Sequence, residues 1–79
     1  MNDIKTLAQV QPGECAFVEE LLTRGDMRRR LLDIGLVKNA PVVCLGKSPC
    51  GDPRAYQICG AVIAVRQADA AGVLVRLDG

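Results

Sequence analysis

The chain has 79 residues, ten basic and nine acidic, and a formal net charge of +1. This length supports one hydrophobic core, so we expect a single domain over residues 1–79. The balanced charge argues against duplex-DNA binders that neutralise many phosphates and against polybasic membrane anchors. No apolar stretch approaches the ~18 residues of a membrane span. The start also lacks a secretory signal, so we expect a soluble cytoplasmic protein without membrane insertion.

The first half of the chain predicts one strand followed by a short helix. A Pro-Gly turn at residues 12–13 precedes the segment 14–22, in which Ala16 and Val18 alternate with more polar neighbours. This alternation predicts a half-buried strand. Asp26 follows a break that contains glycine. Its carboxylate can accept bonds from first-turn amides, so we expect it to cap a helix over residues 26–34.

The predicted helix has one apolar face and ends at a glycine. Met27, Leu31 and Ile34 recur at i, i+4 and i+7, so we expect them to pack on the sheet and hold it closed. Gly35 stands where a left-handed C-cap is favoured. Leu36 can then supply the apolar contact that follows such a cap.

The second half predicts strands and turns. Ala61–Val65 is apolar throughout, so we expect both of its faces to be covered. Val73–Leu77 is expected to expose an edge at which a second copy can pair, giving a weak homo-oligomer. Closure limits the unpaired edges of a small bent sheet, so we predict a mostly β fold, a small barrel of about five strands with one short α-helix. The remaining elements are strands at 42–45 and 55–59, a turn at 48–53 and a helical turn within 66–71.

The four cysteines form no Cys-x-x-Cys pair, and the chain has no histidine. Closed zinc sites usually take ligands from closely spaced pairs, so we expect most of these thiols to be reduced and buried as small apolar groups. Cys50 is the exception because it lies in the predicted turn. Cys50 and Cys59 are the candidate ligands if the protein binds a transition metal ion such as Fe²⁺ or Zn²⁺. The other two cysteines, Cys15 and Cys44, are expected to be buried.

The sequence does not favour catalysis. It has no histidine to act as a general base near neutral pH, and no glycine-rich loop at P-loop spacing. Glu19 and Glu20 are neighbours on the predicted strand, so their carboxylates point to opposite faces and cannot pair without a bulge. We therefore predict that the protein is not an enzyme.

Four short motifs follow one another along the chain: Pro12-Gly13-Glu14, Arg30-Leu31-Leu32-Asp33-Ile34-Gly35-Leu36, Pro49-x-Gly51-Asp52-Pro53 and Gly60-Ala61-Val62-Ile63-Ala64-Val65-Arg66. In this order and spacing they resemble the FeoA family, small cytoplasmic proteins of bacterial ferrous iron transport. The resemblance covers nearly the whole chain. It implies a src-homology-3-like (SH3-like) β-barrel with the helix packed across it. It also implies a non-enzymatic role beside FeoB, the membrane GTPase permease of that system.

One departure from the family pattern lies just after the helix. Where the family usually has a Pro-Gly pair, this chain has Lys38-Asn39. Asparagine tolerates the left-handed conformation better than most residues. We therefore expect the turn to keep its shape.

The candidate partner-binding residues lie on the helix and in the turn at 48–53. Arg28 and Arg29 face outward, where they either dock on an acidic surface or form an ordinary solvated face. Leu32 is an interface anchor if it is exposed and a core residue if it is not. Pro49 and Asp52 belong to a turn that is either a rigid hairpin tip or a contact loop.

We favour an accessory or regulatory function, exerted by protein contact with FeoB. This function follows from the resemblance, because the residues alone indicate a small β domain and do not indicate iron.

One alternative is a domain that binds or senses a transition metal ion. Another is a generic SH3-like module for peptides or RNA. The last is disfavoured because the aromatic residues are Phe17 and Tyr56 alone, and such surfaces are built on aromatic rings. We therefore expect no nucleic-acid partner.

Overall fold

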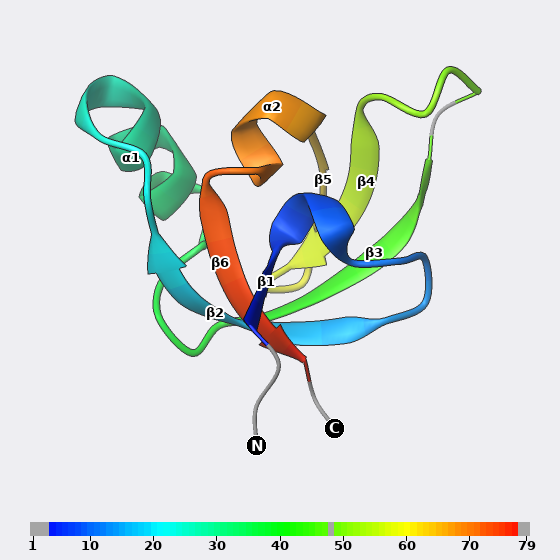
Figure 1. Cartoon of the computed structure of the whole chain (residues 1–79), viewed down its shortest axis with the longest axis horizontal. Coiled ribbons are helices and arrows are strands. Elements are labelled where there is room, and N and C mark those ends of the chain that lie inside the picture. Colours follow the sequence, from blue (N-terminus) through cyan, green and yellow to red (C-terminus); the bar gives the residue numbers. More distant parts are fainter. Residues whose placement is uncertain (1–3, 48, 78–79) are drawn as a thin grey trace.

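The computed structural model describes residues 4–47 and 49–77, so Ser48 of the predicted turn lies outside the described residues. Six antiparallel strands form one curled sheet in the order β1-β6-β2-β3-β4-β5 (Figure 1). The strands are β1 (Ile4–Thr6), β2 (Cys15–Leu21), β3 (Pro41–Lys47), β4 (Arg54–Ile58), β5 (Ala61–Val65) and β6 (Val73–Leu77). The helical elements are the 3-10 helix η1 (Leu7–Gln9), α1 (Gly25–Asp33) and α2 (Gln67–Ala70).

The predicted mostly β fold with one short early helix is confirmed. The predicted strands and the helical turn within 66–71 are present, and β1 is an additional strand. β1 has only three residues, which is too short to show an alternating pattern. Across residues 4–47 and 49–77, no helix has the length and apolarity needed to span a bilayer.

The strand order corrects two predictions about the sheet edges. β6 was expected to expose an edge, but it lies between β1 and β2. β5 was expected to be covered on both faces, but it is an edge strand and Val62 on it is 67% exposed. An apolar run shows that a strand is favourable but does not show which neighbours the strand will have.

The core is built from aliphatic side chains, with Tyr56 as its one fully buried aromatic side chain. On β2, Ala16 and Val18 are buried as predicted. A register shift between Val18 and Glu20 then turns Leu21 inward, as a β-bulge does. The largest fully buried side chains are Tyr56, Leu7, Leu36, Ile58, Val10, Val18, Val42, Val73, Val75 and Cys44.

Polar bonds from β4 hold η1 in place. The Tyr56 hydroxyl donates to the carbonyl of Leu7 at 3.2 Å. Arg54 Nη1 donates to the carbonyls of Ala8 and Val10 at 3.1 and 2.8 Å. The Leu7 carbonyl also accepts the Val10 N–H at 3.2 Å within η1. β4 adds a second bond to this carbonyl and supplies partners to the carbonyls of Ala8 and Val10, so it fixes the position of η1.

α1 ends in a Schellman motif, as the sequence predicts. The Gly35 N–H donates to the Leu32 carbonyl at 3.0 Å, and the Leu36 N–H donates to the Leu31 carbonyl at 3.1 Å. Gly35 has a φ of +107°, and Leu36 is fully buried. A Cβ at position 35 would lie 2.8 Å from the Sγ of Cys59. Gly35 therefore serves both to reverse the chain and to let the end of α1 approach the β4–β5 turn closely.

We expect Gly35→Ala to destabilise the fold by about 1–3 kcal/mol, because the substitution combines an unfavourable φ with a steric clash. Chemical denaturation of the variant and the parent measures this difference. Gly46→Ala is the matched control, since a Cβ there would meet nothing within 4 Å. Equal stability losses in the two variants would contradict the special role of Gly35.

Burial raises the pKa of Tyr56 above its ordinary value of 10.0; the nearby Cys44 adds to this effect and Arg54 opposes it. As the pH rises past 10, the unfolded chain loses the phenolic proton before the folded chain does. This contribution to stability is therefore complete below pH 10 and declines between that value and the folded pKa.

We accordingly expect the loss of stability above pH 10 to be smaller in Tyr56→Phe than in the parent. At neutral pH the variant should lose about 1 kcal/mol with the bond to Leu7. Denaturation curves at several pH values test both expectations. Tyr56 is the one tyrosine of a chain without tryptophan, so phenolate absorbance reports its titration directly. Parallel pH profiles for the two proteins would contradict this assignment.

Candidate partner-binding site

α1 extends away from the curled sheet and is the most prominent element on its side of the molecule (Figure 1). Leu31 is its one fully buried residue. Met27 and Ile34 pack against the core but stay half-buried. Both side chains are thus less buried than the sequence predicts for residues that hold the barrel closed. A groove opens on each flank of the helix and leaves them partly exposed.

The start of α1 differs from the prediction. Helical residues begin at Gly25, with Arg24 as the N-cap and no side-chain cap bond. The prediction that Asp26 caps the helix is therefore wrong. Asp26 instead lies within the first turn, where a carboxylate is favoured by the positive end of the helix dipole.

The first groove, here called the β2 groove, lies between α1 and β2 and has a volume of about 200 Å³. It brings together two of the predicted contact residues, Arg28 and Leu32. Arg28 is exposed, and its Nη1 donates to the Leu21 carbonyl at 3.2 Å. The sequence left Leu32 as either an exposed interface anchor or a core residue, and in the structure it is half-buried. The lining residues are Val18, Glu19, Glu20, Leu21, Arg28, Leu32, Leu36 and Lys38.

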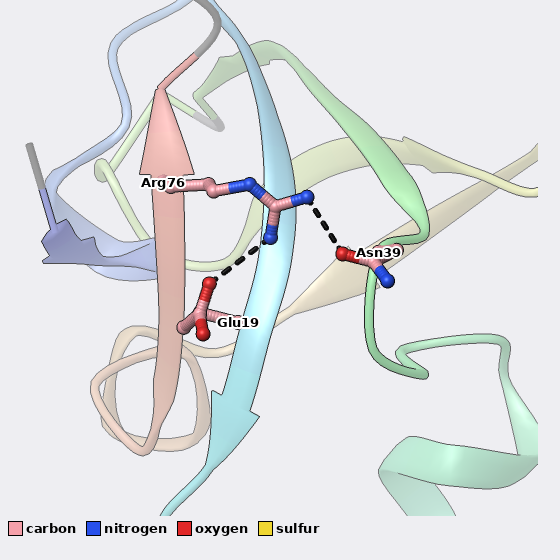
Figure 2. Close-up of polar contacts among 3 residues, drawn as sticks. All are labelled: Glu19, Asn39 and Arg76. Carbon is pink, nitrogen blue, oxygen red and sulfur yellow. Dashed lines mark hydrogen bonds and ion pairs between the residues drawn. The ribbon is translucent and has the colours of Figure 1, made fainter. Parts of the chain in front are cut away.

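An arginine from β6 fixes the acidic side of the β2 groove (Figure 2). Arg76 Nη1 forms a salt bridge with Glu19 Oε1 at 3.0 Å, and Arg76 Nη2 donates to Asn39 Oδ1 at 2.6 Å. The guanidinium also lies over the Phe17 ring, 5.5 Å from its centre. Asn39 has a φ of 71°, which confirms that asparagine keeps this turn. These contacts join β6, β2 and the loop before β3.

The second groove, here called the β5 groove, lies on the other flank of α1 and has a volume of about 350 Å³. One wall is the apolar side of α1, with Met27, Leu31 and Ile34. The other wall is β5 together with the start of α2. Charged groups come from Arg30, Arg66 and Asp69. The lining residues are Met27, Arg30, Leu31, Ile34, Ile63, Ala64, Val65, Arg66 and Asp69.

The other predicted contact residues lie apart from the β2 groove. Arg29 is exposed on α1 and lines neither groove. Pro49 and Asp52 are exposed in the β3–β4 turn, which Figure 1 shows on the opposite side from α1. The carboxylate of Asp52 accepts a bond from the Gln67 N–H at 2.9 Å, so it ties the turn to the start of α2. The predicted contact residues therefore lie in two separate regions, α1 and the β3–β4 turn.

The prediction that every cysteine except Cys50 is buried is wrong for Cys59, which is exposed. Cys44 is buried and Cys15 half-buried, but Cys50 and Cys59 are both exposed. Cys59 is exposed because it forms the β4–β5 turn with a φ of 51°. Cys50 precedes β4 and Cys59 follows it, so the strand separates them by roughly 16 Å. Among the residues that the structure describes, no three histidine, cysteine or acidic side chains gather into a metal-binding group.

The β5 groove is the part of the site that sequence reasoning missed. The sequence led us to expect that the apolar run Ala61–Val65 is covered on both faces, whereas β5 is an edge strand. The groove forms because α1 lies beside this strand. The edge position of β5 follows from the strand order, which no local pattern encodes.

A sequence model of the FeoA domain matches residues 5–77. The chain belongs to the FeoA domain family. This assignment confirms the resemblance seen in the sequence. FeoA domains are known from ferrous iron transport, and the family is not a known enzyme family.

Three relatives illustrate the similarity of this FeoA domain to known proteins. An Fe(2+) transport protein A/Fe(2+) transporter FeoB fusion protein of Porphyromonas gingivalis is 30% identical over 71 residues, which are 90% of this chain and 8% of that protein. FeoA of Chlorobium tepidum has a TM-score of 0.88 at 31% identity, covering 95% of this chain and 71% of that one. FeoA of Stenotrophomonas maltophilia, solved with zinc and described as an SH3 domain protein, has a TM-score of 0.80 at 29% identity, covering 90% and 88%.

The separation of Cys50 and Cys59 gives a prediction about metal binding. Their thiols are too far apart to share an ion with Zn–S bonds of ~2.3 Å. We therefore expect the double variant Cys50→Ser, Cys59→Ser to bind Zn²⁺ and Fe²⁺ with an affinity within about twofold of the parent. Anaerobic calorimetric titration of both proteins measures this ratio. A large loss of affinity in the variant would show that the thiols act together.

Proposed function

We propose that this FeoA domain is a non-enzymatic accessory domain of ferrous iron transport, which acts in the cytoplasm by contact with FeoB. The observation that carries the proposal is the Porphyromonas gingivalis relative, in which FeoA and FeoB form one polypeptide. Two modules in one chain meet at an effective concentration of about millimolar. A fused arrangement is favourable when the two modules work together, even through a weak contact.

The exposed side of α1 supports a contact of this kind. Arg28 and Arg29 are exposed on consecutive positions, and Leu32 offers a half-buried apolar surface beside Arg28 in the β2 groove. Arginine is enriched at interface hot spots because its planar guanidinium binds carboxylates in two-point fashion. An acidic surface of FeoB is the complement of this region.

The effect of the contact on FeoB is a shift between conformations. A bound domain favours whichever FeoB conformation it binds more tightly, and the shift is limited by the difference in affinity. The FeoA domain thereby regulates the permease without taking part in bond making or breaking.

We expect this domain to bind the soluble cytoplasmic domain of FeoB, or the full permease, with a dissociation constant below ~100 μM. The double variant Arg28→Glu, Arg29→Glu should bind about tenfold more weakly, because two attractive charges become repulsive. Calorimetry or interferometry with each FeoB form measures the affinity.

The control for this experiment is Gln11→Glu, which adds negative charge at an exposed position between η1 and β2, outside both grooves. Its affinity should equal that of the parent. Circular dichroism confirms that each variant is folded before binding is compared. Absence of binding to both FeoB forms would refute the proposed function, whereas full binding by the folded double variant would move the interface away from Arg28 and Arg29.

A further inference from the structure

β5 is an edge strand without the features that usually protect an edge. It has five residues, none of them charged or proline, and pairs with β4 without a register shift. The other edge strand, β1, has only three residues and includes Lys5. Flat apolar edges pair readily with added strands, whereas short or charged edges do not. β5 is therefore the edge at which this sheet can be extended.

The turn before β5 determines which of its backbone groups are unpaired. Cys59 and Gly60 have φ values of 51° and 84°, as in a two-residue type I′ turn. Ile58 pairs with Ala61 across this turn. The closing pair of such a hairpin exchanges both backbone bonds, and bonded and unbonded pairs then alternate. The N–H and C=O groups of Val62 and Ala64 therefore point away from β4, toward the free edge.

The β5 groove runs along this free edge. It contacts the consecutive residues 63–65, whose side chains alternate between the two faces of the sheet. A groove that touches all three follows the edge of the strand rather than one face. Met27, Leu31 and Ile34 of α1 form the facing wall. An extended segment placed here would meet backbone groups on one side and apolar side chains on the other.

The charges of the groove favour an acidic occupant. Arg30 enters from α1 and Arg66 from the end of β5, against the one carboxylate of Asp69 on α2. Between described residues, neither arginine forms a salt bridge. The groove is therefore positively charged overall, and its two guanidinium groups are available to bind carboxylates.

We propose that the β5 groove binds an extended, acidic segment of the cytoplasmic part of FeoB, which adds to the sheet as a further strand. This inference rests on the proposed function and deepens it. Backbone bonds to Val62 and Ala64 hold the segment in register. Its apolar side chains face α1, and its carboxylates bind Arg30 and Arg66.

A second copy of this chain fits the groove less well than an acidic segment does. Its own β5 carries no carboxylate and ends next to Arg66. Pairing of two β5 strands would bring further positive charge near the groove and leave both arginines without a counter-charge. Charge complementarity therefore favours the acidic segment over self-association.

Amide hydrogen exchange of this domain, alone and with the soluble cytoplasmic domain of FeoB, tests the strand addition. In the complex, the amides of Val62 and Ala64 should exchange about tenfold more slowly, since they gain hydrogen bonds. The amides of Ala61 and Ile63 already bond to β4, so their exchange should change little. This pattern of alternation distinguishes an added strand from a contact that merely covers β5.

Three variants test the same contact by affinity. Arg30→Glu, Arg66→Glu should weaken FeoB binding about tenfold or more by reversing the charge of the groove. Ala64→Pro should weaken it about fivefold, since proline removes one edge donor and is tolerated on edge strands. Lys5→Glu is the matched control, because Lys5 lies on β1 at the other edge of the sheet and outside both grooves. It should leave the affinity within about twofold of the parent.

The outcomes separate this inference from the proposed function. Binding of FeoB without slower exchange at Val62 and Ala64 overturns the strand addition and leaves the proposed function intact. Slower exchange that depends on the concentration of the domain alone shows self-association and also overturns it. Absence of binding to FeoB refutes both proposals. Because the exchange experiment uses the unmodified domain, a variant that fails to fold does not obscure the result.

Discussion

The position of α1 depends on one close contact between Gly35 and the β4–β5 turn. A side chain at position 35 would collide with the sulfur of Cys59, and the backbone there has a φ that favours glycine. This contact holds the end of α1 against β4. Nearer its start, the helix is tied to β2 by the bond from Arg28 to the Leu21 carbonyl. Between these two points α1 bridges β2 and β5 without filling the space on either side, and both grooves result from this bridging.

A small core makes such specific contacts important. A chain of this length buries a smaller fraction of its surface than a large domain does, so bonds between distant segments contribute noticeably to its shape. Tyr56 and Arg54 reach the carbonyls of η1 across more than forty residues of sequence. Arg76 of β6 likewise binds Glu19 of β2 and Asn39 of the loop before β3. Each of these bonds joins segments that are far apart in the sequence.

Local pattern was enough to predict much of this fold, and long-range pairing accounts for the rest. The helix, its glycine stop and the buried positions of β2 follow from periodicity and from the conformational freedom of Gly35, which act within a few residues. The central place of β6 and the edge place of β5 follow from which strands meet, and no local pattern encodes that. The same limit applies to the site: the outward arginines of α1 were predictable, but the β5 groove needed the strand order. Cys59 is exposed because it occupies a tight turn, although cysteine is commonly buried.

The two grooves share α1 as a common wall, and this has a mechanical consequence for any partner. Leu32 faces one groove while Met27 and Ile34 face the other, so an occupant of either groove contacts the same short helix. Only Leu31 of this helix is fully buried, and added apolar contacts on either side increase the burial that holds it. A partner that fills both grooves therefore contacts both flanks of the same helix and covers more of it than a partner that fills one. An unprotected β5 edge is a liability in an isolated sheet, but beside such a helix it becomes part of a binding surface.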